Sequence, residues 1–445
     1  MTDRTTAKAP DAFDAIDRPT EHAAQADLRA VLQLCAAGKL RCSAKTLRPA
    51  AATVAVVAEV LTGGDFYPHE PVAAYAWPLL LQAGGLAELS GSKLQLTVRG
   101  RTALTKPAHD TIRLLWQKWI TRGVIDEFSR CEEIKGQRAA NVLTAVKPRR
   151  QAVAATLARA AEGEWEEADA FFDRVRSSGN GFAIARSERA QWRLYLVDAE
   201  YGSMGYAGYG DWPLLQGRYT LAVLFEYAAT LGLIDVRHTA PAGARADYHD
   251  QWGADDLDYL TRYDGLLALR LNPLGAYATG AAGTYIPSPR TPDSSDGRRI
   301  KVLGNFDVVA PDGLPAADEL LLSAYAEHTA DRVWQLDSRS LLAALDAGRT
   351  LRELREFLTS RSDHTLPDTV AVLLADVEAR AGKLTDLGPL HLVECADHAL
   401  ALLLVGDRTL RRLCTPLGER HLAVRPDDLP AFRKAVQALG YVLPN

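Results

Sequence analysis

A pattern that occurs twice within residues 70–280 constrains the fold more than any other feature. An apolar helix ends at Gly-Leu and is followed by a short strand and a polar loop. The motif L-x-L-[T/N]-x-x-G then forms a second strand and the start of another helix. The copies run from AWPLLLQAGGLAEL to LQLTVRG (94–100) and from AVLFEYAATLGLIDV to LRLNPLG (269–275). Alternate leucines of the returning strand face the helices, as a strand closing a two-stranded wing requires. The pattern predicts two winged-helix-like modules; a generic α+β domain with two similar hairpins is the alternative.

Length and composition predict a multidomain α+β protein. The chain has 445 residues, well beyond one typical domain, and 47% hydrophobic residues. Pro, Gly, Ser and charge dominate 283–299, which indicates a linker. The predicted parts are a disordered tail at 1–26, a first winged-helix-like module with basic connecting helices at 27–147, a second such module with a long wing at 148–282, the linker at 283–299, and a compact α+β domain at 300–445.

Nothing in the chain reads as a targeting or membrane segment. The N-terminus is charged, and apolar runs such as ALALLLV (399–405) are far shorter than a bilayer span. The five cysteines are scattered and never in CxxC spacing, which indicates reduced thiols. We therefore expect a cytoplasmic protein, and the excess of arginine over lysine together with abundant alanine indicates a GC-rich bacterial genome.

The stretch 335–377 predicts three short helices with clear start and stop signals, which we call the punctuated helices. Asp337 and Ser338 are good N-caps, and Gly348 permits a left-handed exit. Thr350 with Glu353 forms a capping box, and Pro367 fits a first helical position. Around this unit, 300–310 and the segments GPLHLVECAD and ERHLAVRP read as strands, and DDLPAFRKAVQALGY reads as a closing helix.

The segment 300–445 resembles the helicase-associated domain found at the N-terminal side of XPB-type DNA repair helicases. The resemblance is carried by IKVLGNFDVVAP, by WQLDSRSLLAALDAG (334–348), by FLTSRSDHTLP and by HLVECADHAL (391–400). It implies that the punctuated helices are a structural unit of such a domain. Winged-helix modules upstream would be usual among those relatives.

The helicase motor is missing from the sequence. The phosphate-cradling GxxxxGK[S/T] loop does not occur, and neither does a recognisable catalytic constellation. IDEFSR (125–130) resembles a helicase Asp-Glu motif, but without that loop it reads as an ordinary charged segment. We therefore expect a protein that is not an enzyme and carries no cofactor or metal; an enzyme of unrecognised type is the remaining alternative.

Positive charge gathers near the N-terminal end. Residues 28–159 contain 19 Lys and Arg against 9 Asp and Glu, a balance of +10 in a chain of net charge -5. Such a split indicates an anionic partner. The residues predicted to contact the DNA backbone are Lys39, Arg41, Lys45, Arg48, Arg99, Arg101, Lys147, Arg149 and Arg150.

The helices that would enter a DNA groove lack the charge to do so. Residues 49–92 contain no Lys or Arg, and 217–232 contain only Arg218. Phosphate neutralisation normally supplies much of the affinity, so groove reading by these helices is not expected.

Two further patterns have structural and functional interpretations. His391, Cys395 and His398 would share a face of a helix and could bind zinc, but HLVEC reads as a strand and a fourth ligand is not evident. The glycine- and tyrosine-rich loop at 200–210 could stack bases, whereas packing on a neighbouring module is the favoured interpretation.

The sequence therefore predicts a non-catalytic accessory protein of DNA metabolism. It would dock a separately encoded helicase, ATPase or nuclease and bind DNA without sequence preference, in repair or phage defence. A tandem winged-helix transcriptional regulator is the alternative, and no membrane partner is expected.

Overall fold

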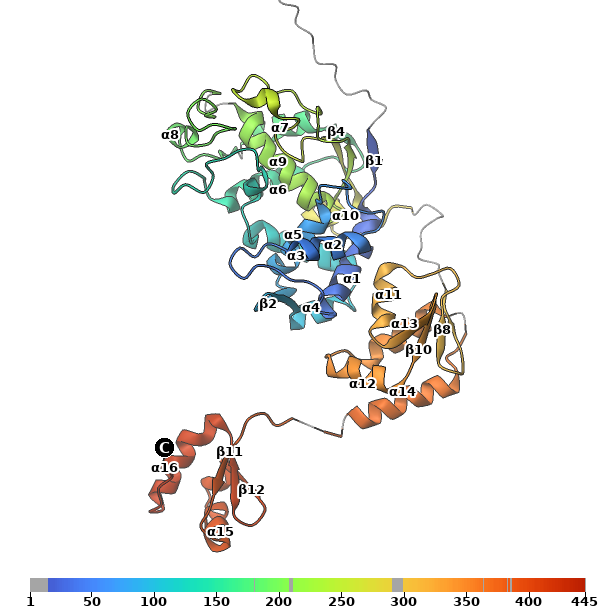
Figure 1. Cartoon of the computed structure of the whole chain (residues 1–445), viewed down its shortest axis with the longest axis vertical. Coiled ribbons are helices and arrows are strands. Elements are labelled where there is room, and N and C mark those ends of the chain that lie inside the picture. The colour runs from blue at the N-terminus through green and yellow to red at the C-terminus, as the bar shows by residue number, and fades with distance from the viewer. Residues whose placement is uncertain are drawn as a thin grey trace, which may run out of the picture. The chain divides into compact units, whose positions relative to one another are not determined.

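The chain is a multidomain α+β protein. The computed structural model describes residues 15–179, 181–207, 211–289, 299–362, 364–381, 383–384 and 386–444. It divides into two compact units, residues 1–373 and 374–445 (Figure 1). The main division therefore falls later than the predicted linker at 283–299. Residues 300–373, which follow that linker, belong to the first unit because α11 (Ala316–Ser323) packs on α1 (Glu21–Ala36).

Helices dominate the first unit. Its other α-helices are α2 (Ala51–Val60), α3 (Ala73–Ala83), α4 (Val98–Ala103), α5 (Ala108–Arg122), α6 (Val146–Leu157), α7 (Ala168–Ser177), α8 (Glu188–Gln191), α9 (Arg218–Ala222), α10 (Pro273–Thr279), α12 (Ser338–Asp346) and α13 (Leu351–Arg361). Helix α14 (Asp368–Ala381) crosses the division. The π-helical segments η2 (Pro213–Gly217) and η3 (Val223–Ala229) flank α9, and short 3-10 turns are η1 (Glu127–Arg130) and η4 (Ala254–Asp256).

Among the described residues of this unit, three antiparallel sheets support these helices. Their strands are β1 (Ile16–Arg18), β2 (Ala87–Ser90), β3 (Lys93–Leu96), β4 (Trp165–Glu167), β5 (Ile234–His238), β6 (Leu266–Leu271), β7 (Lys301–Val302), β8 (Asp307–Val309), β9 (Ala326–Ala330) and β10 (Val333–Leu336). The sheet orders are β1-β5-β6-β4, β7-β8-β10-β9 and β2-β3. Register pairs Ala87 with Leu96 in the hairpin β2–β3, and Ile234 with Leu271 in β5–β6.

The repeated sequence pattern forms the predicted order of helix, strand, strand and helix. It runs α3, β2, β3, α4 in the first copy and α9–η3, β5, β6, α10 in the second. The structure adds a third instance, α11, β9, β10, α12. In each, the residue after the returning strand caps the next helix with its side chain: Thr97 accepts from the Gly100 amide, Asn272 from Gly275 and Asp337 from Ser340.

The glycine of L-x-L-[T/N]-x-x-G has a steric cause. A Cβ on Gly100 would lie 2.0 Å from the Leu86 carbonyl oxygen, and one on Gly275 would lie 1.9 Å from that of Leu233. In both copies the capped helix thus packs directly on the backbone that leads into the first strand. The third instance escaped sequence analysis because Ser340 replaces this glycine.

We expect alanine at Gly100 or Gly275 to destabilise the first unit by about 1–3 kcal/mol, because the added methyl overlaps a backbone oxygen. Ser340→Ala at the equivalent position should stay within about 0.5 kcal/mol. Urea unfolding of the three variants measures the difference. Equal stability of Gly100→Ala and Ser340→Ala would contradict this account of the motif.

The helix at 213–229 is the centre of the first unit. Leu221, Leu224 and Phe225 have 0% exposed side chains and belong to a single core that extends from Ala24 to Ala278. The long connection 239–265 packs on this core, since Tyr248, Leu260 and Tyr263 are also fully buried. Tyr248 and Tyr263 of this connection are therefore part of the core.

The predicted disordered tail is shorter than 1–26. Residues 1–14 lie outside the described residues, but β1 pairs with β5 in the register Ile16 to His238. The Thr20 hydroxyl then donates to the Ile234 carbonyl at 2.6 Å, and α1 begins at Glu21. The interpretation of 16–26 as disordered was wrong because β1 is stabilised by a strand more than 200 residues away.

The punctuated helices form as predicted, with one difference. Asp337 and Thr350 cap α12 and α13, and Gly348 has a φ of +83°. Glu353 does not close the capping box on Thr350; its carboxylate accepts instead from the Tyr325 hydroxyl at 2.7 Å. The run 300–310 is also a hairpin of β7 and β8 rather than one strand, with Phe306 at a φ of +74° in the turn.

The second unit is a small α+β domain. It contains β11 (His391–Glu394), α15 (His398–Gly406), η6 (Leu410–Arg412), β12 (Cys414–Leu417), β13 (His421–Val424), η7 (Pro426–Asp428) and α16 (Leu429–Ala438). The sheet order is β11-β13-β12. Leu404, Leu422 and Phe432 lie in its core. The strands and the closing helix expected between 388 and 441 are confirmed.

Candidate nucleic-acid interface

A short extended segment brings basic residues beside the first hairpin. The Leu94 amide donates to the Leu40 carbonyl, and the Cys42 amide donates to Ser92, both at 2.9 Å. This pairing places Arg41 opposite Lys93, with Lys39 next to them. Lys39 and Arg41 are exposed, and Lys93 is half-buried over Gly38. Sequence analysis missed Lys93 because nothing in the sequence reports that residues 40–42 pair with β3.

Lys45 and Arg48 lie in the turn that leads from this segment to α2. Lys45 is exposed, whereas Arg48 is half-buried and donates to the Ser129 hydroxyl at 2.6 Å. Lys45 is therefore free to contact an anion, and Arg48 is partly occupied within the fold.

Arg99 and Arg101 are both exposed on α4. The Arg101 guanidinium donates to the Leu96 carbonyl at 3.0 Å, which holds it near β3. Together with Lys93 it lines a cavity of about 650 Å³ whose opposite wall comes from α12 and α13. Arg99 lies instead close to Gly85, just before β2. Within the described residues, no carboxylate forms an ion pair with Lys39, Arg41, Lys45, Lys93, Arg99 or Arg101, which we call the hairpin basic group.

Arg149 and Arg150 do not lie on a DNA-accessible surface. They are 1% and 3% exposed, while Lys147 on the same helix is exposed. Arg149 pairs with Asp126 at 2.6 Å and Arg150 with Glu127 at 2.8 Å. Their prediction as DNA contacts was wrong because the IDEFSR segment supplies a half-buried carboxylate, Asp126, to Arg149 and a buried one, Glu127, to Arg150. That segment is therefore an ion-pair partner of α6.

Buried ion pairs continue along the central helix. Arg218 donates from Nε to Asp264 at 3.1 Å and has 0% exposure, and Asp247 also binds its guanidinium. Burial would lower the pKa of Arg218, but Asp264 and Asp247 raise it. Further along, Glu226 accepts from Arg130 at 2.9 Å. These groups hold the connections 126–132 and 247–264 against the helix, and no pattern in the sequence marks them as buried.

Asp27 on α1 is a buried carboxyl group with a shifted titration. Burial raises its pKa to about 7, although the Thr62 amide donates to it at 2.7 Å. An acid whose folded-state pKa exceeds its unfolded value of about 3.9 reduces stability as pH rises between the two values.

We therefore expect Asp27→Asn to gain stability relative to the native chain as pH rises from 5 to about 8, where the gain levels off, because Asn keeps the acceptor without the charge. Urea unfolding at each pH measures it. Asp331→Asn, at a carboxylate that is 95% exposed, should show no such trend. A pH-independent difference for Asp27→Asn would contradict the buried-acid assignment.

The tyrosine loop forms aromatic pairs with its surroundings. Tyr206 meets Trp192 edge-on at 4.8 Å, and Tyr201 lies against Trp252 at 5.4 Å. Tyr209 lies outside the described residues. The two tyrosines nonetheless remain 65% and 56% exposed. Their rings therefore pack on neighbouring aromatic side chains, and each ring also keeps a face exposed to solvent.

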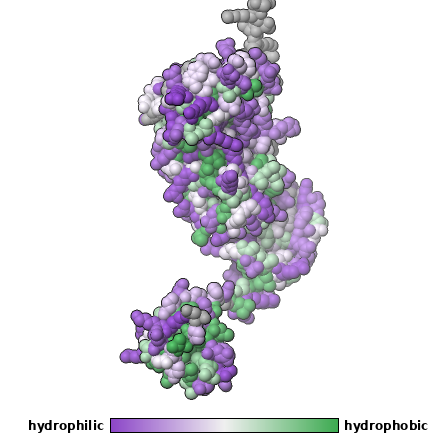
Figure 2. All heavy atoms as spheres, turned by 60° about the vertical axis from the view of Figure 1, so that its left-hand side comes forward, coloured by the Kyte–Doolittle hydropathy of each residue, from purple (hydrophilic) through white to green (hydrophobic). Residues whose placement is uncertain are grey.

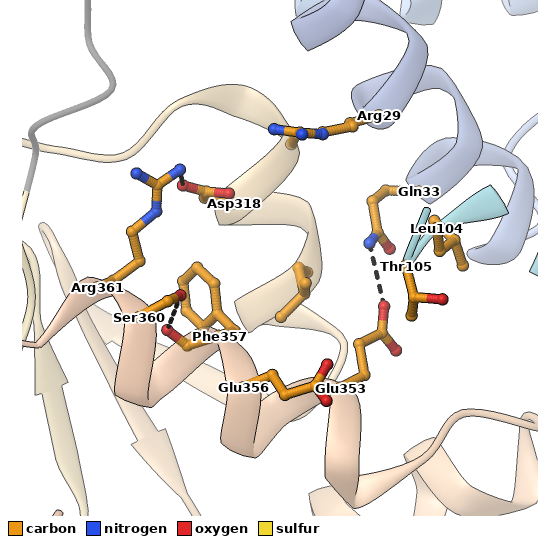
Figure 3. A pocket seen from close by; sticks show the side chains of 12 residues that line it. Arg29, Gln33, Leu104, Thr105, Asp318, Glu353, Glu356, Phe357, Ser360 and Arg361 are labelled. Atoms are coloured by element: carbon orange, nitrogen blue, oxygen red, sulfur yellow. Dashed lines mark hydrogen bonds and ion pairs between the residues drawn. The ribbon is translucent and has the colours of Figure 1, made fainter. Parts of the chain in front are cut away.

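A cleft lies between α1 and the part of the chain that follows the predicted linker at 283–299 (Figure 3). Its volume is about 390 Å³. Gln33 on α1 donates to Glu353 on α13 at 3.3 Å and accepts from Arg349 at 2.8 Å. On the other side, Arg361 pairs with Asp318 at 2.6 Å, and burial raises the pKa of Asp318. The Gln33 contacts therefore join α1 to α13 and to the residue Arg349 before it, whereas the Arg361–Asp318 pair joins α13 to α11.

The histidine and cysteine residues near 395 do not share a helix face. His391 lies on β11 as predicted, Cys395 is buried after it, and His398 begins α15, where its Nδ1 lies 2.9 Å from the Glu419 carbonyl oxygen. Within the described residues, no group of three His, Cys, Asp or Glu side chains is placed to hold a metal ion. No described helix is long and apolar enough to span a bilayer.

Comparison with known families supports one part of the prediction. Residues 302–416 match the family model of the helicase conserved C-terminal domain. No curated protein matches the chain. The match lies inside the segment 300–445 and includes α12 and α13, which line the 650 Å³ cavity together with Lys93 and Arg101. Residues 302–416 are therefore similar to a helicase domain, which supports the predicted helicase-associated domain in this part of the chain.

Proposed function

We propose that this protein is a non-catalytic accessory factor of DNA metabolism that docks a separately encoded helicase, ATPase or nuclease and holds DNA by its backbone. One observation carries the proposal. Lys93 on β3 and Arg101 on α4 line the same cavity as α12 and α13, which lie in the segment matched to a helicase domain. A DNA backbone bound by the hairpin basic group would thus run beside a domain type that accompanies helicases.

The positions of the basic residues favour contact with the DNA backbone over recognition of the base sequence. Helix α3, which precedes the hairpin and would be the reading helix of a winged module, buries Trp77, Leu79 and Leu80 almost completely. It also has no Lys or Arg. Lysines and arginines around the hairpin without carboxylate partners among the described residues suit phosphates, whose position carries no sequence information.

Copurification from the native host with mass spectrometry tests the docking role. We expect an ATP-dependent helicase or a nuclease among the specific partners, from a repair or a phage-defence system. Recovery of unrelated metabolic enzymes alone would contradict the proposal. Hydrolysis of ATP by the purified chain would contradict its non-catalytic part.

Selection of bound fragments from random DNA separates this proposal from a tandem winged-helix regulator. A regulator yields a consensus sequence, whereas phosphate contacts yield none. We expect bound fragments without a shared motif. A reproducible motif would favour the regulator.

A further inference from the structure

Helix α15 has an unusual composition for a helix at the surface of a small domain. Its sequence HALALLLVG contains no charged residue and, after His398, no polar one. A helix that is apolar on every side is normally buried on every side. Within the second unit only one side is covered: Ala401 and Leu404 are 6% and 4% exposed.

The uncovered side forms a continuous apolar stripe. Ala399, Leu402, Leu403 and Gly406 follow the spacing i, i+3, i+4, i+7, and all four are exposed. Leu402 and Leu403 are 58% and 52% exposed. Small residues at both ends of the stripe leave room for close approach of a second helix. Figure 2 shows hydrophobic residues gathered on one face of this unit, which is recognised in Figure 1 by its labels α15 and α16.

Three arginines flank the C-terminal end of the stripe. Arg408, Arg411 and Arg412 are exposed and form no ion pair with a carboxylate among the described residues. The nearest acid, Asp407, instead accepts from the amides of Thr409 and Leu410 at 2.8 and 3.0 Å. Segment η6, which carries Arg411 and Arg412, packs directly against α15. The stripe is therefore bordered by uncompensated positive charge.

We propose that α15 docks an acidic amphipathic helix of a partner protein, with leucine-type residues on the stripe and carboxylates against Arg408, Arg411 and Arg412. The inference rests on the proposed docking function in naming a protein as the occupant. An apolar helix face requires an apolar counterpart, and three unpaired guanidiniums require an acidic flank. The same surface would exclude a basic amphipathic helix by like-charge repulsion.

Binding of two designed peptides to the full chain tests the proposal. Both are 18-residue helical peptides with leucines along one face; one carries glutamate at all other positions and the other carries lysine. We expect the acidic peptide to bind at least tenfold more tightly in fluorescence anisotropy. Leu402→Glu with Leu403→Glu should abolish this binding, and Arg408→Glu, Arg411→Glu and Arg412→Glu together should reverse the preference. Val442→Glu, at a residue 78% exposed, is the matched control without effect.

Several results would overturn the inference. They are no saturable binding of the acidic peptide, equal binding of both peptides, or binding that survives the leucine substitutions. Photo-crosslinking from a benzophenone amino acid at position 402 in the native host gives a second measurement. A crosslink to an acidic helix of another protein supports the proposal, and a crosslink to DNA, to a second copy or to this chain's own first unit overturns it.

The two proposals fail in different ways. If a helicase copurifies equally with the native chain and with the double leucine variant, the docking function stands and the α15 inference falls. If no helicase or nuclease copurifies while the acidic peptide binds as expected, the α15 surface stands and the proposed function falls.

Discussion

Replacing Arg150 by alanine will lower the unfolding free energy of the first unit by about 3–5 kcal/mol, because it leaves the carboxylate of Glu127 buried without its cation. Glu127 is 0% exposed and accepts from Arg150 Nε at 2.9 Å. The Arg150 guanidinium also lies over the Trp119 ring, so packing is lost together with charge. Urea unfolding followed by tryptophan fluorescence measures the change.

The loss of stability in the Arg150→Ala variant should depend on pH. Burial already raises the pKa of Glu127 to about 7, and Arg150 opposes that effect. Without Arg150 the folded-state pKa rises further, so the variant's deficit should grow as pH rises from 5 to 8 and shrink when Glu127 is protonated. Lys147→Ala, on the exposed side of the same helix, should change stability by less than about 0.5 kcal/mol. Equal losses for the two variants would contradict the buried ion pair.

Reversing Lys39, Arg41, Lys93 and Arg101 to glutamate will abolish retention of duplex DNA at physiological salt. These side chains form no ion pair with a carboxylate among the described residues, so their charge is available to phosphates. For the native chain, log Kd should rise linearly with log salt concentration, by about 0.9 for each phosphate neutralised. Fluorescence anisotropy over a salt series measures both the affinity and the slope.

The matched control reverses exposed arginines outside the hairpin basic group. Arg339 on α12 and Arg352 on α13 are each 85% exposed. Their reversal should leave DNA binding within about twofold, apart from a small long-range effect at low salt. Absence of binding by the native chain at low salt, or equal loss in both variants, would show that the hairpin basic group is not a DNA contact.

Local sequence patterns predicted the helices and strands better than they predicted which side chains are buried. The caps at Asp337 and Thr350 act through neighbours three residues away, so the sequence contains the whole interaction. Arg149 and Arg150 differ from exposed arginines only through Asp126 and Glu127, 23 residues earlier. Their burial depends on how η1 packs against α6, which no local spacing reports. Lys93 was missed for the same reason, since its neighbour Arg41 comes from another segment.

The buried helix at 213–229 has a consequence for how the chain acquires its structure. Glu226 has one partner before the helix, Arg130, and one after it, Tyr263. Arg218 has its partners Asp247 and Asp264 after the helix. A growing chain that has reached residue 147 therefore lacks its central hydrophobic element and the carboxylate partners of Arg218. The two modules inferred from the sequence repeat are in this sense halves of one cooperative folding unit, which closes only after β6 has been synthesised and can pair with β5.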